Sequence, residues 1–237
     1  MQPWTDVAPG LRLTGDRAAW IVAEEAVVIA DLHIGYARAA RRRGGYLPNA
    51  EPPAALATRV LAVTAKLGAR RLVIAGDLRH STRDVDAEEL AEVDEFLARL
   101  SPLQRVDLVA GNHDRGTVGM TARVTVGDVD VIHAPPAHVP GRWTVCGHLH
   151  PSATVRDETG AGARYPCALL GPRTLVLPAF TDWAGGARLS RVREALPPGE
   201  WRQVVVTGGG VLENGSFQLS ALGSRRLRKG HGDVPHA

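Results

Sequence analysis

The sequence of 237 residues is poor in cysteine, lysine and aromatic side chains. Its two cysteines, Cys146 and Cys167, exclude a disulfide framework and a four-thiolate zinc site, and they indicate a reducing compartment. We expect both thiols in the core. Aromatic residues make up 5% of the chain, so extensive stacking with bases is not expected. The net charge of +3 permits a phosphate-rich partner without requiring one.

Long hydrophobic runs are also missing from the sequence. No stretch of about 18 apolar residues occurs, and the first ten residues lack the basic and apolar regions of a secretory leader. We therefore predict a cytoplasmic protein with no membrane partner. A content of 44% hydrophobic and 22% charged residues excludes a disordered or fibrous chain. We predict one domain over residues 1–222 and a flexible tail over 223–237, which is rich in glycine and charge.

Short β-branched segments that end in turn residues predict buried strands. They are LRLTG, AAWIVAEEAVVIAD, RRLVIAGD, VDLVAGNHD, VDVIHAPP and TVCGHLH. Between them, apolar spacing predicts a helix over residues 50–67, after the entry signal Pro48-Asn49, and a second helix along Leu90–Leu100. Acidic residues precede the second helix or lie in its first turn, where they favour a helix N-terminus: Asp84, Asp86, Glu88 and Glu89. Alternating strands and helices predict an α/β core, and the β segments after residue 163 predict a second sheet packed on the first.

Metal-ligating side chains follow the predicted strands. They are Asp31, His33, Asp77, Asn112, His133, His148 and His150, with His113 and Asp114 beside them. Because the carboxyl ends of parallel strands meet at one edge, these side chains can converge. Carboxylate, amide and imidazole ligands without a thiolate suit two divalent cations, most of all Mn²⁺, with iron or zinc as alternatives. Taken singly, each residue has an ordinary alternative, such as an aspartate that caps a helix.

Five motifs occur in order: D-L-H at 31, G-D at 76, G-N-H-D at 111, His133 and G-H-L-H at 147. With these motifs the sequence resembles the calcineurin-like metallophosphoesterase superfamily over residues 11–187. The resemblance implies a four-layer αββα sandwich of two mixed sheets flanked by helices. It assigns Asp31, His33 and His150 to one cation and Asn112, His133 and His148 to the other, with Asp77 bridging both. Two such cations would activate a shared water for attack on phosphorus.

The resemblance also gives roles to two residues beside the ligands. His113 would stabilise the transition state or protonate the departing alkoxide. Asp114 would hold the His113 ring and raise its pKa, which suits a proton donor.

Several stretches are similar to one branch of the superfamily, the bacterial DNA-ligase-associated metallophosphoesterases. They are ADLHIGYARAARRRGGYLPN, AGDLRHS, GNHDRG, GHLHPS and LVLPAFTDWAGG, and the pattern departs from the branch at Tyr36, Arg79 and Ala134. This resemblance implies DNA as the substrate in a repair context, beside a DNA helicase and an ATP-dependent DNA ligase. The G-D-x-x-H arrangement ending in His80 also resembles the nucleases that process double-strand breaks.

Four arginines follow the first ligand pair and are candidates for phosphate contacts, with a solvated helical face as the alternative: Arg38, Arg41, Arg42 and Arg43. His80 could face the substrate or hold its own loop, and Trp183, Gly185 and Gly186 could line the rim of the site. We predict a phosphodiesterase that acts on DNA, with phosphomonoesters as further substrates. The alternatives are a nucleotide or cyclic-nucleotide phosphodiesterase, and a non-catalytic scaffold like the retromer subunit of this fold. The scaffold predicts missing ligands, and none is missing.

Overall fold

The computed structural model describes residues 2–47, 50–83, 85–156, 158–184 and 186–219. The helix-entry signal Pro48-Asn49, Asp84, Gly185 and the predicted tail 223–237 lie outside the described residues. No helix in the described part has the length and apolar character needed to cross a bilayer.

The first sheet has six strands in sequence order, with its parallel part formed by the last three. Its strands are β1 (Trp4–Ala8), β2 (Leu11–Thr14), β3 (Ala19–Ile21), β4 (Ala26–Ile29), β5 (Arg71–Ala75) and β6 (Arg105–Val109). Buried aliphatic residues on both faces of β4 and β5 explain why these segments form central strands.

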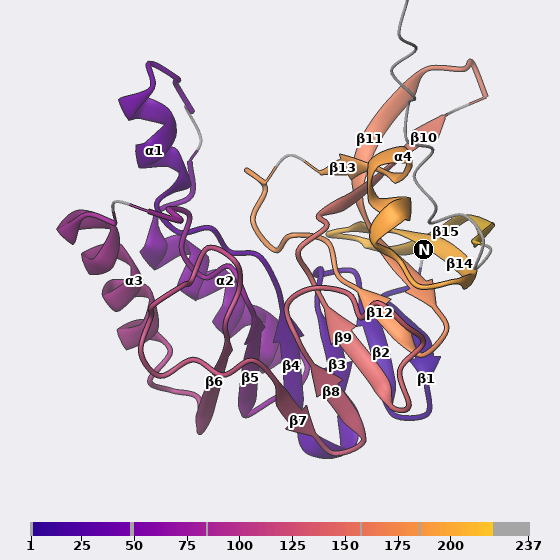
Figure 1. Ribbon diagram of the computed structural model, residues 1–237, viewed down its shortest axis with the longest axis horizontal. Helices are drawn as coiled ribbons and strands as arrows, with labels where there is room; N and C mark the ends of the chain where they lie inside the picture. Colours follow the sequence, from indigo (N-terminus) through magenta and orange to yellow (C-terminus); the bar gives the residue numbers. More distant parts are fainter. Residues whose placement is uncertain (1, 48–49, 84, 157, 185, 220–237) are drawn as a thin grey trace, which may run out of the picture.

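Two helices cover the outer face of this sheet: α2 (Pro53–Lys66) and α3 (Ala87–Arg99). The start of α2 has proline at its first position, and α3 begins where the Asp86 side chain accepts a hydrogen bond of 2.7 Å from the Glu89 N–H. A shorter helix, α1 (Tyr36–Arg42), follows the first ligand pair and projects from the sheets (Figure 1). A 3-10 turn, η1 (Val22–Glu24), joins β3 to β4.

The second sheet has nine strands in the described chain. They are β7 (Val124–Val126), β8 (Val129–Val131), β9 (Trp143–Cys146), β10 (Pro151–Arg156), β11 (Gly162–Gly171), β12 (Thr174–Val176), β13 (Ala187–Arg188), β14 (Gly199–Thr207) and β15 (Gly210–Leu219). The order is β13-β10-β11-β12-β9-β8-β7, and β14 pairs with both β11 and β15. Parallel pairing occurs between β8 and β9 and between β9 and β12.

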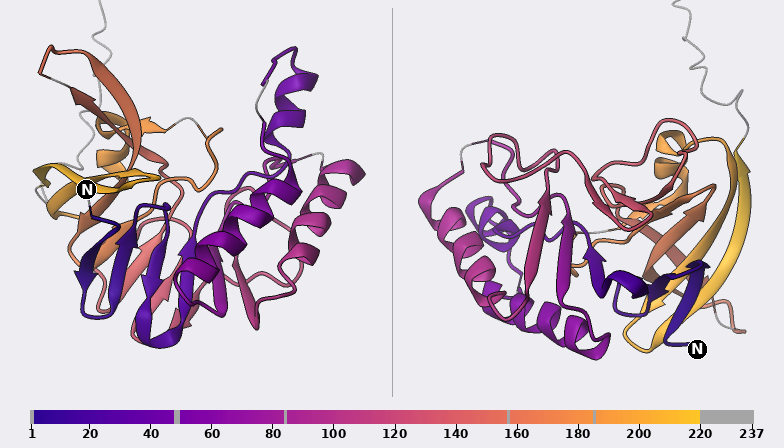
Figure 2. Two further views of the ribbon diagram at one scale, coloured as in Figure 1. Left: turned by 180° about the vertical axis from the view of Figure 1, so that it is seen from behind. Right: turned by 90° about the horizontal axis from the view of Figure 1, so that it is seen from below.

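Three hydrophobic clusters separate the layers, which Figure 2 shows edge-on in its right panel. One contains residues of both sheets, such as Val28, Val73 and Leu175, and fills the space between them. Another packs the first sheet against α2 and α3, and the third packs the second sheet against α4 (Leu189–Val192) and against Leu196, which follows the 3-10 turn η2 (Arg193–Ala195). The predicted four-layer sandwich of two mixed sheets is confirmed, with an outer layer on the second sheet that is one short helix and one turn in the described residues.

The two cysteines lie in the third cluster, both buried and unpaired. Burial raises the pKa of the Cys146 thiol, and it raises that of Cys167 to about 12. Both are therefore structural thiols, as the composition indicated.

Candidate metal centre

The predicted ligands lie beyond the carboxyl ends of five strands, three in the first sheet and two in the second. Asp31 and His33 follow β4, Asp77 follows β5, Asn112 follows β6, His133 follows β8, and His148 and His150 follow β9. Backbone hydrogen bonds connect the neighbouring loops, from Asp31 N–H to the Gly76 carbonyl (3.1 Å) and from His33 N–H to the Asp77 carbonyl (2.9 Å). The parallel strands therefore bring together side chains that are far apart in the sequence.

Backbone conformation at the centre is unusual. Eight non-glycine residues of the described chain have positive φ, and five of them are predicted ligands: Asp31 (58°), His33 (48°), Asp77 (50°), His148 (70°) and His150 (42°). Such a conformation costs about 1–3 kcal/mol per residue and persists where the surrounding structure enforces it. Concentration of this strain at the strand ends makes the region a candidate functional site.

Two glycines leave room for the carboxylates. A Cβ on Gly111 would meet the backbone nitrogen and Oδ1 of Asp77, and one on Gly147 would meet Oδ2 of Asp31. No side chain can be added at either position without displacing a predicted ligand. The glycines of the G-N-H-D and G-H-L-H motifs are thus explained by close approach.

One group of ligand atoms consists of Asp31, His33, Asp77 and His150, all within 4.8 Å of one another. The Nε2 atoms of His33 and His150 are 3.2 Å apart, His33 Nε2 is 3.8 Å from Asp77 Oδ2, and His150 Nε2 is 3.5 Å from Asp31 Oδ1. Bonds of about 2.1 Å to one ion place neighbouring ligand atoms roughly 3.0–3.5 Å apart. The spacing and the donor types fit a divalent cation.

A second group consists of Asp77, His133 and His148. His133 Nε2 lies 3.4 Å from Asp77 Oδ1, 3.0 Å from His148 Nδ1 and 2.9 Å from Asn112 Oδ1. The other nitrogen of His133 faces the Ala75 carbonyl at 3.0 Å, which orients the ring. Asp77 belongs to both groups, so its carboxylate lies where a bridging ligand would be.

Burial shifts the pKa values of several ligands of the centre. Burial and the neighbouring histidines lower the pKa of His33 to about 2. The pKa of His148 is also lowered, mainly by burial and to a smaller extent by the neighbouring His133. For His150, burial is outweighed by the hydrogen bond and charge of Asp31, and its pKa is raised. Burial raises the pKa of the Asp77 carboxyl. A neutral imidazole is the form that binds a cation, so the lowered pKa values favour the ligand form of His33 and His148. The raised pKa values of His150 and Asp77 mean that binding of a cation would have to displace protons there.

His113 lies beside both groups. Its Nε2 is 3.9 Å from Asp77 Oδ2, and its ring contacts the His33 ring edge-on at 4.8 Å between centroids. On the far side of the ring, Nδ1 is hydrogen-bonded to the His80 carbonyl. His113 Nε2 therefore faces the centre while Nδ1 is anchored.

Asp114 does not hold the His113 ring, which corrects the role expected from the sequence. Its carboxylate accepts backbone N–H bonds from Leu78 (3.2 Å), Arg79 (3.2 Å) and Gly111 (3.0 Å). Asp114 is 2% exposed, and these bonds fix the loops after β5 and β6 against each other. The His80 carbonyl takes the orienting position instead.

Glu89 holds the backbone on both sides of the His80 carbonyl, a role that the sequence did not predict. The Glu89 carboxylate, 3% exposed, accepts hydrogen bonds from the backbone N–H of His80 (3.1 Å) and of Ser81 (2.8 Å), and from the Ser81 hydroxyl (2.5 Å). Sequence analysis placed Glu89 among the acidic residues of a helix start. No signal in the sequence distinguishes this buried carboxylate from its exposed neighbours.

The four arginines behave differently from one another. Arg38 is paired with Asp86 (3.1 Å), Glu88 (2.8 Å) and Glu92, so it connects α1 to α3. Arg42 also contacts Asp86, at 2.5 Å.

Arg43, directly after the C-terminal end of α1, reaches His80: its Nη2 lies 3.5 Å from His80 Nε2. The His80 ring stacks edge-on with Tyr36, and its Nδ1 is buried without a hydrogen-bond partner. Arg41 is exposed near the end of α1. A ring nitrogen of His80 lies within 4.8 Å of ring nitrogens of His33 and His113, which places His80 beside the metal centre, whereas Arg41 stays at the surface.

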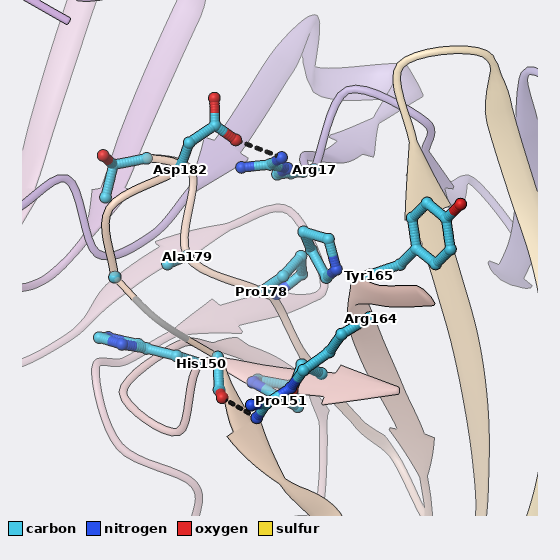
Figure 3. A pocket seen from close by; sticks show the side chains of 13 residues that line it. Arg17, His150, Pro151, Arg164, Tyr165, Pro178, Ala179 and Asp182 are labelled. Carbon is cyan, nitrogen blue, oxygen red and sulfur yellow. Dashed lines mark hydrogen bonds and ion pairs between the residues drawn. The ribbon is translucent and has the colours of Figure 1, made fainter. Parts of the chain in front are cut away.

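A cavity of about 280 Å³ lies against His150 (Figure 3). Its other walls come from the start of β10, from β11, from the loop before β13 and from Arg17. Gly186 lines this cavity, as expected for a rim residue, while Trp183 is not among its lining residues.

Known proteins were compared with this chain. No family profile and no curated protein matches the sequence. Among solved structures, nuclease MPE of Pseudomonas putida is similar at 26% identity and a TM-score of 0.64, over 86% of this chain and 94% of the nuclease. The phosphoesterase Yfce of E. coli has 17% identity and a TM-score of 0.39, over 82% of this chain and 99% of Yfce. Vps29 of Chaetomium thermophilum has 12% identity and a TM-score of 0.33, over 82% of this chain and 94% of Vps29.

Proposed function

Because the chain has the calcineurin-like metallophosphoesterase fold, we propose that it is a metal-dependent phosphodiesterase that hydrolyses DNA. The observation that carries the proposal is the pair of ligand groups that share Asp77. A scaffold of this fold would have no need to retain all seven predicted ligands, five of them with strained backbone, beyond the ends of the strands. The similarity to a nuclease supports a nucleic acid as the substrate.

The ligand groups fit two divalent cations, and their imidazole and oxygen donors favour Mn²⁺, with iron or zinc as alternatives. Asp31, His33 and His150 would hold one cation, Asn112, His133 and His148 the other, and Asp77 both. When bound, such cations supply Lewis-acid activation of water and neutralise charge on the phosphate oxygens. The strained backbone and the glycine contacts keep these ligand side chains in place before substrate arrives.

His113 is the residue proposed to move a proton. Its anchored Nδ1 keeps Nε2 pointed at the centre, where it can donate to the leaving oxygen. Glu89 contributes by holding the backbone at His80, so the orientation of His113 depends on a residue that does not touch the substrate.

Arg41, Arg42 and Arg43 are proposed to contact the DNA backbone. They lie on or just after α1, which follows the first ligand pair in the sequence and projects from the sheets (Figure 1). Their positive charge would attract phosphates in a salt-dependent manner without reading sequence. Arg38 has a different task, because its guanidinium is occupied by three carboxylates.

The repair context, in association with a DNA helicase and an ATP-dependent DNA ligase, is part of the proposal and rests on the resemblance of the motifs. A second candidate function is hydrolysis of nucleotides or cyclic nucleotides. The cavity beside His150 favours it, because its volume of about 280 Å³ is close to the lower end of small-ligand pockets, roughly 300–1,000 Å³.

The test compares substrates side by side. Metal-free protein is incubated with Mn²⁺, Zn²⁺ or no metal and given single-stranded DNA, duplex DNA, cyclic nucleotides and bis(p-nitrophenyl) phosphate. The proposal expects Mn²⁺-dependent cleavage of DNA and of the chromogenic diester. Cleavage of cyclic nucleotides with intact DNA would favour the second candidate. No hydrolysis of any diester with any metal would contradict both.

A further inference from the structure

The cavity beside His150 adjoins the metal centre directly. His150 belongs to one ligand group and also lines the cavity. The next residue along the chain, Pro151, begins β10, and β10 pairs with β11, where Ala153 is opposite Tyr165. The ligand and the cavity wall are thus parts of one continuous hairpin, and a phosphate ester held at the centre would extend one substituent toward this space.

Tyr165 provides an aromatic wall. Figure 3 shows its ring across the cavity from His150, with Pro178 and Ala179 between them. The tyrosine is 38% exposed although it lies on a strand, so its ring is not used in the core. An accessible aromatic ring beside an apolar wall is a surface on which a flat group can stack.

Two arginines at the cavity are held in fixed positions. Arg164 donates from Nε to the Ser152 hydroxyl at 2.7 Å and from Nη2 to the Gly186 carbonyl. Arg17 forms an ion pair with Asp182 at 2.5 Å and donates to the Phe180 carbonyl at 3.1 Å. A guanidinium has five N–H donors, and these bonds use fewer than five on each arginine. Both arginines therefore keep N–H donors that a ligand in the cavity can use. Fixed side chains lose little conformational entropy when a ligand binds.

The charges at the cavity favour a neutral polar ligand. Asp182 offsets the charge of Arg17, so the cavity does not have the paired free cations expected of a second phosphate site. A nucleoside matches better, because a base offers a flat ring for Tyr165 and carbonyl oxygens for arginine N–H groups. The cavity volume of about 280 Å³ suits one such group.

We propose that this cavity binds a nucleoside attached to the scissile phosphate, with its base stacked on Tyr165 and its polar edge toward Arg164 or Arg17. The proposal rests on the proposed function, since it needs a phosphodiester at the metal centre. It adds a subsite that sets how strongly a nucleotide is preferred over a bare phosphate diester.

The test uses three substrates with one leaving group: the 5′ and 3′ p-nitrophenyl phosphates of thymidine, and methyl p-nitrophenyl phosphate. Tyr165→Ala should lower kcat/KM about ten-fold for at least one thymidine ester, which equals about 1.4 kcal/mol, and change the methyl ester less than about two-fold. Tyr165→Phe keeps the ring and should behave as wild type. Because Tyr165 is at the surface end of β11, the alanine variant is expected to fold.

Inhibition gives a second measurement on the same variants. Thymidine monophosphates should inhibit methyl ester hydrolysis more strongly than inorganic phosphate does in wild type, and the advantage should disappear in Tyr165→Ala. Equal losses on all three esters, or an unchanged advantage of the nucleotides, would overturn the subsite. Failure of the proposed phosphodiesterase chemistry looks different, because wild type would then hydrolyse none of the esters. Failure of DNA as the substrate is read separately, from DNA that stays intact while the esters are cleaved.

Discussion

The metal centre and helix α1 are neighbours that are built in opposite ways. Ligands such as Asp31 and Asp77 are almost fully buried, have strained backbone and are placed by the ends of parallel strands. Arg41 and Arg42 on α1 are exposed, and α1 is tied to α3 through ion pairs of Arg38 and Arg42. The comparison teaches that the candidate metal ligands are fixed by the core, whereas the arginines proposed to contact the substrate lie on a surface helix that can change without disturbing the core.

The largest effect should come from Asp77→Asn, because Asp77 belongs to both ligand groups. We expect loss of measurable hydrolysis. Metal affinity should fall by more than the roughly 10–100-fold that follows when a residue hydrogen-bonded to a metal ligand is replaced. Metal content by mass spectrometry and turnover of a chromogenic diester measure both. The control is Asp107→Asn, which removes a carboxylate that pairs with Arg71 and Arg105 on the same sheet. Normal turnover by Asp77→Asn would remove the bridging role.

The next effect should come from His113→Ala. The variant should keep its metal and lose about 10²–10⁴-fold in kcat on DNA, because a poor leaving group needs the proton most. The loss should be smaller on nitrophenyl esters, whose leaving group departs unprotonated. His138→Ala, at an exposed position, serves as control. Equal losses on DNA and nitrophenyl esters would argue against His113 as the acid.

A moderate effect is expected from replacing Arg41, Arg42 and Arg43 together by glutamine. DNA binding should weaken several-fold, and the slope of log affinity against log salt should decrease by about 0.7 for each lost contact with single-stranded DNA. Hydrolysis of a small diester should stay within about two-fold.

A matched control for this experiment replaces three arginines at the opposite edge of the first sheet. Arg70, Arg99 and Arg105 each pair with an acidic residue there. Their replacement should leave the salt slope of DNA binding unchanged. If the variant of Arg41, Arg42 and Arg43 also keeps the wild-type salt slope, α1 is a solvated helix face that does not contact DNA.

The smallest effect is expected from Arg38→Gln. This guanidinium is 12% exposed and contacts carboxylates of Asp86, Glu88 and Glu92, so its loss should lower the free energy of unfolding by about 1 kcal/mol. Thermal unfolding at low and high salt measures it. Arg99→Gln breaks an exposed i,i+4 pair with Glu95 and should cost less, about 0.3–0.5 kcal/mol. Equal costs for the two variants would show that α1 is not held by its ion pairs.

The sequence predicted the parts of the molecule that depend on local pattern. Buried strands such as β4 and β5 and helices such as α2 follow from their apolar spacing, and strand ends rich in aspartate and histidine predicted the convergence of the ligands. The role of Asp114 was wrong because an aspartate next to a histidine in sequence is not next to its ring in space. Asp114 accepts three backbone N–H bonds, two from the loop after β5 and one from the loop after β6, and no local pattern encodes the contact between these loops.

Long-range contacts account for the other differences. Arg38 lies in a basic run, yet it pairs with carboxylates 48–54 positions later because α1 and α3 lie side by side. The cavity beside His150 combines Arg17 with residues after 149, so its walls are known only once both sheets are in place. Glu89 became a buried support for the loop at His80 for the same reason.

The ligands are divided between the two halves of the sandwich: four of the predicted set follow strands of the first sheet and three follow strands of the second. An ion shared by such a set acts as a cross-link between layers that are otherwise joined mainly by aliphatic packing. At a concentration of 100 times its dissociation constant, a bound cation adds about 2.7 kcal/mol to the resistance against unfolding. The proposed metal centre therefore predicts that saturation with Mn²⁺ raises the melting temperature and slows proteolysis, because a cation bound there would tie the two sheets together.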